Sequence, residues 1–174
     1  MRMNNLELPL ERDRFFRTII RSLSGTLEQT IGLEEASGYI ALVGSEVGEW
    51  IREEYNKAAD KTQFTPREVA DILVDLKRRI GGKFSVERVE NDRIILRNTA
   101  CPFGELVKNR PSLCQMTTNV FGRIAADNQG YARIALPKTI AKGDDHCLAI
   151  VYLTRDNAAE ERGREFFSTV PEGV

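Results

Sequence analysis

Apolar residues recur at spacings of three and four along the first half of the chain, which predicts three amphipathic helices. The first covers about residues 11–32 and ends at a glycine, a common helix stop. The third begins at the capping box Thr65-Pro66-Arg67-Glu68, with proline at the first helical position, and ends at Gly81-Gly82. Its predicted core stripe consists of Val69, Ile72, Leu73, Leu76 and Ile80.

The second predicted helix, about residues 34–59, carries two different stripes. The large apolar stripe consists of Tyr39, Val43, Val47 and Trp50, with Leu42 and Ile51 at its flank. The small stripe consists of Ser37, Ala41, Gly44 and Gly48. Small residues on one face let another backbone approach closely. Three explanations are open: packing on a helix of the same chain, a helix-mediated dimer, or room for a ligand. We favour the first, because such faces most often simply pack.

Beyond Gly82 the spacing of apolar residues changes from that of helices to that of strands. Residues 83–89 and 93–97 predict a hairpin, a helix follows over about 111–129, and residues 131–136 and 147–153 predict two more strands. This order predicts an α+β protein in which N-terminal helices pack on a four-stranded antiparallel sheet with a crossing helix. We expect a single domain over residues 10–155. It lies between an N-terminal tail (1–9) and a C-terminal tail (156–174), with at most a short helix near residues 160–167.

Composition is that of an ordinary soluble globular protein, with 174 residues, 41% of them hydrophobic and 29% charged. A net charge of -1 provides no field that attracts nucleic acid or an anionic membrane, so we expect neither as a partner. No apolar run approaches the ~18 residues of a membrane span, and MRMNNLELPLERDRFF lacks the apolar core of a secretory signal. We therefore expect a cytoplasmic protein with reduced thiols, since three cysteines do not suit a disulfide framework.

The three cysteines, Cys101, Cys114 and Cys147, are the main candidates for chemistry. Each lies at the end of a predicted element, where distant segments can meet. Cys114 lies in the first turn of a predicted helix, where the dipole would stabilise a thiolate. Together the thiols could bind zinc or an iron–sulfur cluster. The candidates for the unknown fourth ligand are His146, Asp144 and Glu105. The competing interpretation is that the cysteines are buried as small hydrophobic residues.

Sequence motifs of the common enzyme classes are absent. A nucleophilic site would have to pair Cys101 or Cys114 with the single histidine, His146. We interpret Lys77-Arg78-Arg79 as a solvated face, because cations suit the end of a helix. We expect most of the aromatic residues on the helical stripes in the core, and a few beside a ligand pocket between helices and sheet. These aromatic residues are Phe15, Phe16, Tyr39, Trp50 and Phe121. Catalysis is uncertain, and a non-enzymatic role is favoured.

The segment CPFGELVKNRPSLCQMTTNVFGRIAADNQGYARIALPKTIAKGDDHCLAIVYL, together with LEQTIGLEEASGYIALVGSEVGEWI, resembles the methanogen output domain. That family is in turn similar to the 4-vinyl reductase type of ligand-binding domain, a relative of the haem–nitric-oxide-binding fold. The resemblance covers about residues 10–153. Its most specific features are Cys101-Pro102-Phe103-Gly104, the helix start at Pro111 with Cys114 three residues later, and the Gly143-Asp144 turn before Cys147.

The resemblance implies a sensor domain that binds a small molecule or a metal and is often dimeric through its N-terminal helices. In relatives that sense aromatic effectors, a zinc site uses the cysteines matching Cys114 and Cys147 and further Glu and Cys ligands. Residues 136–140 contain neither Glu nor Cys, and Cys101 is the candidate replacement. The family also suggests tetrapyrrole chemistry, for which no residue here gives independent support.

We therefore predict a stand-alone sensory or regulatory domain of prokaryotic signal transduction. It binds a metal or small ligand near the three cysteines and signals through a partner protein, as a homodimer formed by its N-terminal helices. The alternatives are an enzyme (a hydrolase or a reductase) with a reactive cysteine, and a partner-binding module with structural cysteines.

Overall fold

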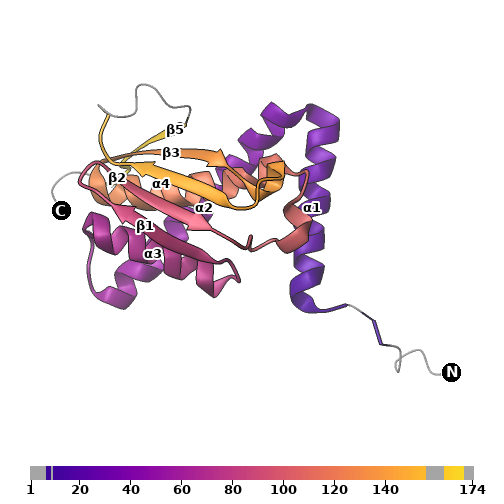
Figure 1. Cartoon of the computed structure of the whole chain (residues 1–174), viewed down its shortest axis with the longest axis horizontal. Coiled ribbons are helices and arrows are strands. Elements are labelled where there is room, and N and C mark those ends of the chain that lie inside the picture. Colours follow the sequence, from indigo (N-terminus) through magenta and orange to yellow (C-terminus); the bar gives the residue numbers. More distant parts are fainter. Residues whose placement is uncertain (1–6, 9, 156–162, 171–174) are drawn as a thin grey trace.

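The computed structural model of the protein describes residues 7, 8, 10–155 and 163–170 (Figure 1). Its helices are α1 (Arg12–Ile31), α2 (Leu33–Ala59), α3 (Pro66–Arg79) and α4 (Cys114–Gln129), with the short 3-10 turns η2 (Gly104–Val107), η3 (Pro111–Leu113) and η4 (Ile140–Lys142). Its strands are β1 (Phe84–Val89), β2 (Arg93–Asn98), β3 (Tyr131–Lys138), β4 (Cys147–Tyr152) and β5 (Arg164–Phe167). The α+β class and all four helices are confirmed, and both hydrogen bonds of the Thr65 capping box are present. Within the described residues, no helix is both long and apolar enough to span a membrane.

The sheet contains five antiparallel strands in the order β1-β2-β4-β3-β5, so the prediction of four strands was wrong. The additional strand, β5, pairs with β3 in the segment for which we predicted a tail with at most a short helix. Phe166 of β5 is buried against α4, where a side chain at Gly122 would collide with its ring. Because β5 has only four residues and is held by one buried ring, the polar segment around it shows almost no strand-like alternation of apolar and polar residues. Most of the predicted N-terminal tail (1–9), and residues 156–162 and 171–174 of the C-terminal one, lie outside the described residues.

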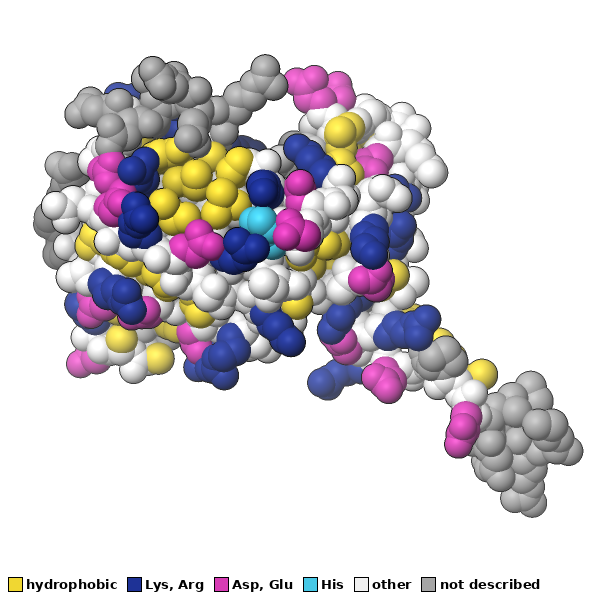
Figure 2. Space-filling model, in the orientation of Figure 1, with side chains coloured by type: hydrophobic (Ala, Val, Ile, Leu, Met, Phe, Trp, Pro, Cys, Tyr) yellow, Lys and Arg dark blue, Asp and Glu magenta, His cyan; other side chains and the backbone are white. Residues whose placement is uncertain are grey.

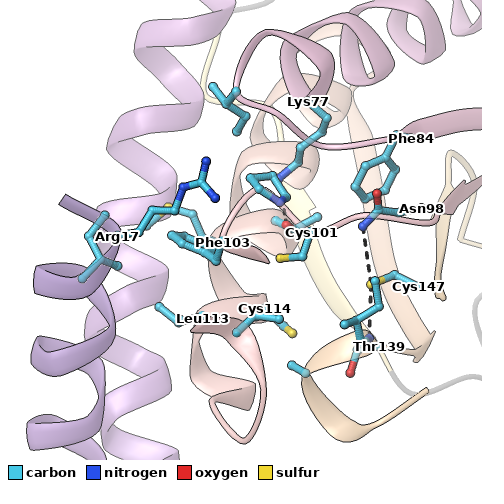
Figure 3. A pocket seen from close by; sticks show the side chains of 18 of the residues that line it. Arg17, Lys77, Phe84, Asn98, Cys101, Phe103, Leu113, Cys114, Thr139 and Cys147 are labelled. Carbon is cyan, nitrogen blue, oxygen red and sulfur yellow. Dashed lines mark hydrogen bonds between the residues drawn. The ribbon is translucent and has the colours of Figure 1, made fainter. Parts of the chain in front are cut away.

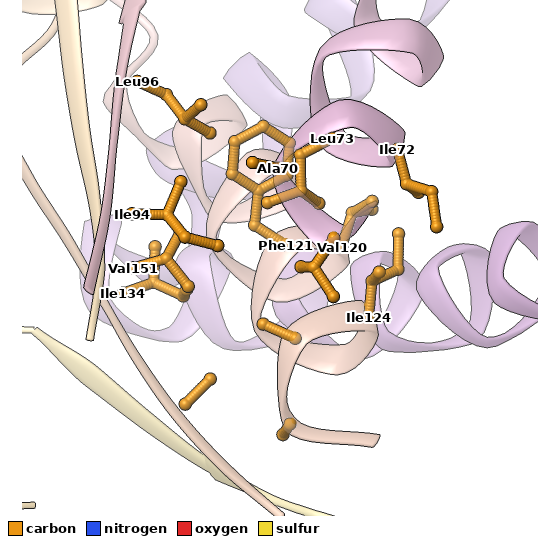
Figure 4. Packing of buried hydrophobic residues seen from close by; sticks show 14 of the residues in the cluster. Ala70, Ile72, Leu73, Ile94, Leu96, Val120, Phe121, Ile124, Ile134 and Val151 are labelled. Atoms are coloured by element: carbon orange, nitrogen blue, oxygen red, sulfur yellow. The ribbon is translucent and has the colours of Figure 1, made fainter. Parts of the chain in front are cut away.

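The hydrophobic core fills the space between the sheet and helices α3 and α4 (Figure 4). Leu73 of α3 and Phe121 of α4 are fully buried there against Ile94 and Leu96 of β2. The predicted stripe on α3 is buried at Val69, Ile72, Leu73 and Leu76, but the prediction was wrong for Ile80, which follows the last helical residue and is exposed. Helices α3 and α4 thereby cover one face of the sheet. Of the N-terminal helices that we predicted to pack on the sheet, only α3 does so directly, because α2 packs on α4 and α1 packs on α2.

Helix α2 packs its small stripe directly against α4. A β-carbon at Gly44 would lie 2.9 Å from the β-carbon of Asn119, and one at Gly48 would lie 3.0 Å from that of Arg123. Atoms this close leave no space for any side chain at the two glycines. The small stripe therefore serves close packing within the chain, which was the explanation we favoured.

Most of the large stripe of α2 consequently faces outward, although Val47 and the flanking Ile51 are partly buried against the core. We predicted that most of the aromatic residues on the helical stripes lie in the core, and this was wrong for all but Phe121. The exposed ones are Phe15, Phe16, Tyr39 and Trp50, each more than half exposed. Because α2 buries its small face, the opposite face with its large residues is turned away from the core. The result is an apolar surface on α1 and α2, which also includes Ile19, Leu23, Leu42 and Val43.

We predict that the same substitution at two glycines of α2 will change stability in opposite directions. Gly44→Ala should lower the free energy of unfolding by about 1 kcal/mol or more, because overpacking costs more than the helix gains. Gly38→Ala should raise it by up to about 1 kcal/mol, since Gly38 is exposed and has open space around its α-carbon. Urea unfolding of both variants measures the difference, and equal effects would contradict the close approach of α2 to α4.

Candidate ligand cavity

All three cysteines line one cavity of about 230 Å³. Cys147 begins β4 and pairs in register with Asn98 at the end of β2, so the antiparallel pairing brings it close to Cys101, which follows β2. Cys114 begins α4 on the other side of the cavity. Figure 3 shows the three thiols facing the same space. The sequence predicted that the cysteines lie at element ends, and the fold brings those ends together.

Asn98 fixes the orientation of one thiol. Its side-chain oxygen accepts hydrogen bonds from the backbone N–H groups of Lys83 and Ala100, at 3.2 Å each. Its side-chain nitrogen is then directed toward Cys147 Sγ, 3.7 Å away, and the backbone N–H of Ile140 donates to the same sulfur at 3.4 Å. These two donors hold the sulfur of Cys147 in one position at the edge of the cavity.

A buried lysine, Lys77, shares the cavity with the thiols. Only 4% of the residue is exposed. Its Nζ donates a hydrogen bond to Thr117 Oγ1 at 2.8 Å and lies 5.2 Å from the ring centre of Phe121 and 5.7 Å from that of Phe84. Our interpretation of Lys77-Arg78-Arg79 as a solvated face was therefore wrong for Lys77, although Arg78 and Arg79 are exposed.

Burial controls the protonation of these groups. Desolvation lowers the pKa of Lys77 from 10.5 to about 8, against the opposing effect of the three thiols. Burial also raises the pKa of Cys101, and it raises that of Cys114 to about 11. Near pH 7 the cavity therefore holds a charged ammonium beside neutral thiols at Cys101 and Cys114. At Cys114, desolvation outweighs the helix dipole that we expected to stabilise a thiolate.

The three candidates for a fourth metal ligand lie outside the cavity. Glu105 is exposed and pairs with Lys108. Asp144 accepts a hydrogen bond from the backbone N–H of Thr139 at 2.7 Å, and Nδ1 of His146 lies 2.6 Å from Oδ1 of Asp145. Across the described residues, no cluster of three or more His, Cys, Asp or Glu side chains is arranged to hold a metal ion. The residues that line the cavity fit a metal cation poorly, because the Lys77 ammonium would repel it. The zinc or iron–sulfur site therefore stays a prediction.

Helix α1 forms one wall of the cavity through Phe16, Arg17 and Ile20. Only Ser24 and Gly25 of this helix are buried, so apolar packing holds it weakly. Polar contacts hold it instead: Arg21 donates to the carbonyls of Leu106 and Lys108, and Glu28 accepts a hydrogen bond from Ser112 and pairs with Arg110. These partners belong to the η2–η3 segment, which lies between Cys101 and Cys114.

Sequence reasoning missed Lys77, although a signal was present. Lys77 lies four residues after Leu73 and seven after Ala70, so it continues the buried face of α3. A lysine on a core stripe is rarely fully buried in proteins without a specific partner. Its helical position should have suggested a buried charge.

The family comparison agrees with the resemblance seen in the sequence. The model of the family described as methanogen output domain 1 matches residues 19–152, which include all three cysteines and Lys77. No protein of curated function matches the chain. The relationship to 4-vinyl reductase domains stays a prediction.

We predict that Lys77→Met will stabilise the protein at pH 7 by about 1–2 kcal/mol. A lysine pKa that falls from 10.5 to about 8 on folding corresponds to about 3 kcal/mol of lost stability, partly offset by the Thr117 and aromatic contacts. The folded protein binds fewer protons than the unfolded chain between pH 8 and 10.5, so this penalty is complete below pH 8 and disappears as the pH approaches 10.5.

Chemical unfolding under reducing conditions at pH 7 and pH 10 measures the effect. Lys83→Met removes the same charge from an exposed position beside β1 and should change stability by less than about 0.5 kcal/mol. A Lys77→Met variant less stable than the wild type at pH 7, or a difference independent of pH, would show that Lys77 is a structural residue.

Proposed function

We propose that this chain, which belongs to the methanogen output domain 1 family, is a sensory and regulatory domain whose cavity binds a small ligand and whose helix α1 passes the binding state to a partner. The observation that carries the proposal is the double role of α1. Phe16 and Ile20 line the cavity, while Phe15, Ile19 and Leu23 of the same helix belong to the exposed apolar surface.

A ligand in the cavity would push on α1, which has few buried contacts to resist it. Local elements with little apolar burial open at the lowest free energy, so they are the parts of a fold that move on binding. The polar contacts to the η2–η3 segment can then exchange for contacts with water. A shift of α1 would displace the exposed face that a partner reads.

Two features favour this binding function over an enzyme with a reactive cysteine. Burial keeps Cys101 and Cys114 protonated at neutral pH, whereas a nucleophilic cysteine needs a lowered pKa. His146, the single candidate base, is not among the residues that line the cavity.

We predict that filling the cavity will loosen α1. Methyl methanethiosulfonate converts a thiol to a methyl disulfide and releases methanesulfinic acid, so it adds an S–CH₃ group at each thiol it reaches. Hydrogen–deuterium exchange should become faster in α1 of the modified protein and stay unchanged in α4. The variant with Cys101, Cys114 and Cys147 all changed to Ser should show no response, and unchanged protection of α1 in the modified wild type would contradict the proposal.

The apolar surface of α1 and α2 supports the proposal of a homodimer. Exposed apolar patches of this kind mark protein interfaces. The exposed Arg12 and Arg14 lie at the start of α1, whereas α2 begins with the exposed Glu34 and Glu35. Figure 2 shows basic and acidic side chains side by side along the projecting part of α1. In an antiparallel two-fold pair, the start of α1 in one chain would face the acidic start of α2 in the other.

We predict that Phe15→Gln combined with Leu23→Gln will convert a dimer to a monomer in sedimentation experiments, with unchanged circular dichroism. Both side chains are exposed and neither lines the cavity. Phe167→Gln removes an equally exposed ring from β5 and should leave the dimer intact. A wild-type chain that is monomeric at high micromolar concentration would rule out this interface.

A metal at the three thiols is the second candidate. The convergence of the thiols on one cavity favours it, whereas the neighbouring Lys77 ammonium opposes it, and the described residues form no arranged group of three ligands. Sulfur donors suit zinc or an iron–sulfur cluster, which they would hold as thiolates. Metal analysis and an absorption spectrum of anaerobically purified protein test this candidate. About one zinc per chain, or the iron and sulfide of one cluster, lost in Cys101→Ser would support it, and metal-free protein would remove it.

A further inference from the structure

The ammonium group of Lys77 has no anionic partner in the described structure. No ion pair of the described residues includes Lys77, and the ionisable groups that act on it are the three thiols, with no carboxylate among them. Buried charges in proteins are normally paired. The Thr117 hydroxyl accepts one hydrogen bond from the ammonium, and the rings of Phe84 and Phe121 lie close to it. None of these three groups carries a negative charge.

The walls of the cavity define the rest of the ligand. Most are apolar, including Phe16, Ile20, Phe84, Phe103, Leu113 and Ile140. A protein cavity of about 150 Å³ binds benzene, so about 230 Å³ leaves space for a six-carbon body with a small polar group. A phosphate group would need several cations or N–H donors, whereas Lys77 is the only buried Lys or Arg among the cavity-lining residues.

We propose that the cavity binds a small organic acid whose single carboxylate pairs with Lys77 and whose apolar body packs against the walls. This inference rests on the proposed function and specifies its ligand class. Asp13 and Arg17, the charged residues of α1 at the exposed side of the cavity, form an ion pair with each other, which leaves Lys77 as the unpaired cation among the described lining residues. Carboxylate and ammonium would then share a desolvated site, where their attraction is strongest.

Calorimetric titration with cyclohexanecarboxylate and with cyclohexylmethanol at pH 7 tests this inference. The two probes share a ring and differ in charge. Wild-type protein should bind the acid at least tenfold more tightly than the alcohol. In Lys77→Met the affinity for the acid should fall at least tenfold, while the alcohol binds within about twofold of its wild-type affinity, which shows that the cavity is intact. Lys83→Met controls for the loss of a surface charge and should bind both probes like the wild type.

Equal affinity of the wild type for acid and alcohol would overturn the carboxylate inference and leave the cavity as a ligand site. Binding of the acid that survives in Lys77→Met would overturn it as well. Failure of both probes to bind would also overturn it, and the proposed function would then be judged separately by the exchange of α1 after thiol modification. The two ideas can therefore fail independently.

Discussion

The close approach of α2 to α4 at Gly44 and Gly48 is the constraint on which the rest of the structure depends. It aligns α2 along the helix that begins with Cys114, and it turns the large side chains of α2 outward. Helix α1 packs on α2 and contacts the η2–η3 segment, so its position follows from theirs. A bulkier residue at either glycine would separate α2 from α4. One steric requirement therefore sets the position of α2 and, through it, that of α1, which lines the cavity and carries part of the exposed apolar surface.

The cavity combines features that stability alone does not explain. A buried ammonium without an anionic partner lowers the stability of the empty protein, and a helix with two buried residues is held weakly. Proteins often retain such unfavourable features where binding requires them. A carboxylate ligand would neutralise Lys77, and its body would press on Phe16 and Ile20. Binding of one ligand would therefore both pair the charge of Lys77 and displace α1.

The parts of the fold with local signals were predictable from the sequence. The capping box of α3 and the alternation in β1 and β2 both depend on near neighbours in the chain, and both formed as predicted. Strand β5 depends on the contact between Phe166 and Gly122, two residues that lie far apart in the sequence. The sequence likewise predicted three thiols at element ends, but not the shared cavity. Lys77 was missed because a charged residue was assumed to be solvated, although its helical position placed it on the buried face.

The central claim is that the cavity and the exposed surface are coupled through α1. Such coupling is reciprocal and amounts to about 1–3 kcal/mol in typical regulatory proteins. The most direct measurement is the dimer dissociation constant, by sedimentation equilibrium, with and without saturating cyclohexanecarboxylate. The account predicts a change of at least fivefold for the wild type and no change for Lys77→Met. A wild-type dissociation constant that stays the same when the cavity is occupied would contradict it.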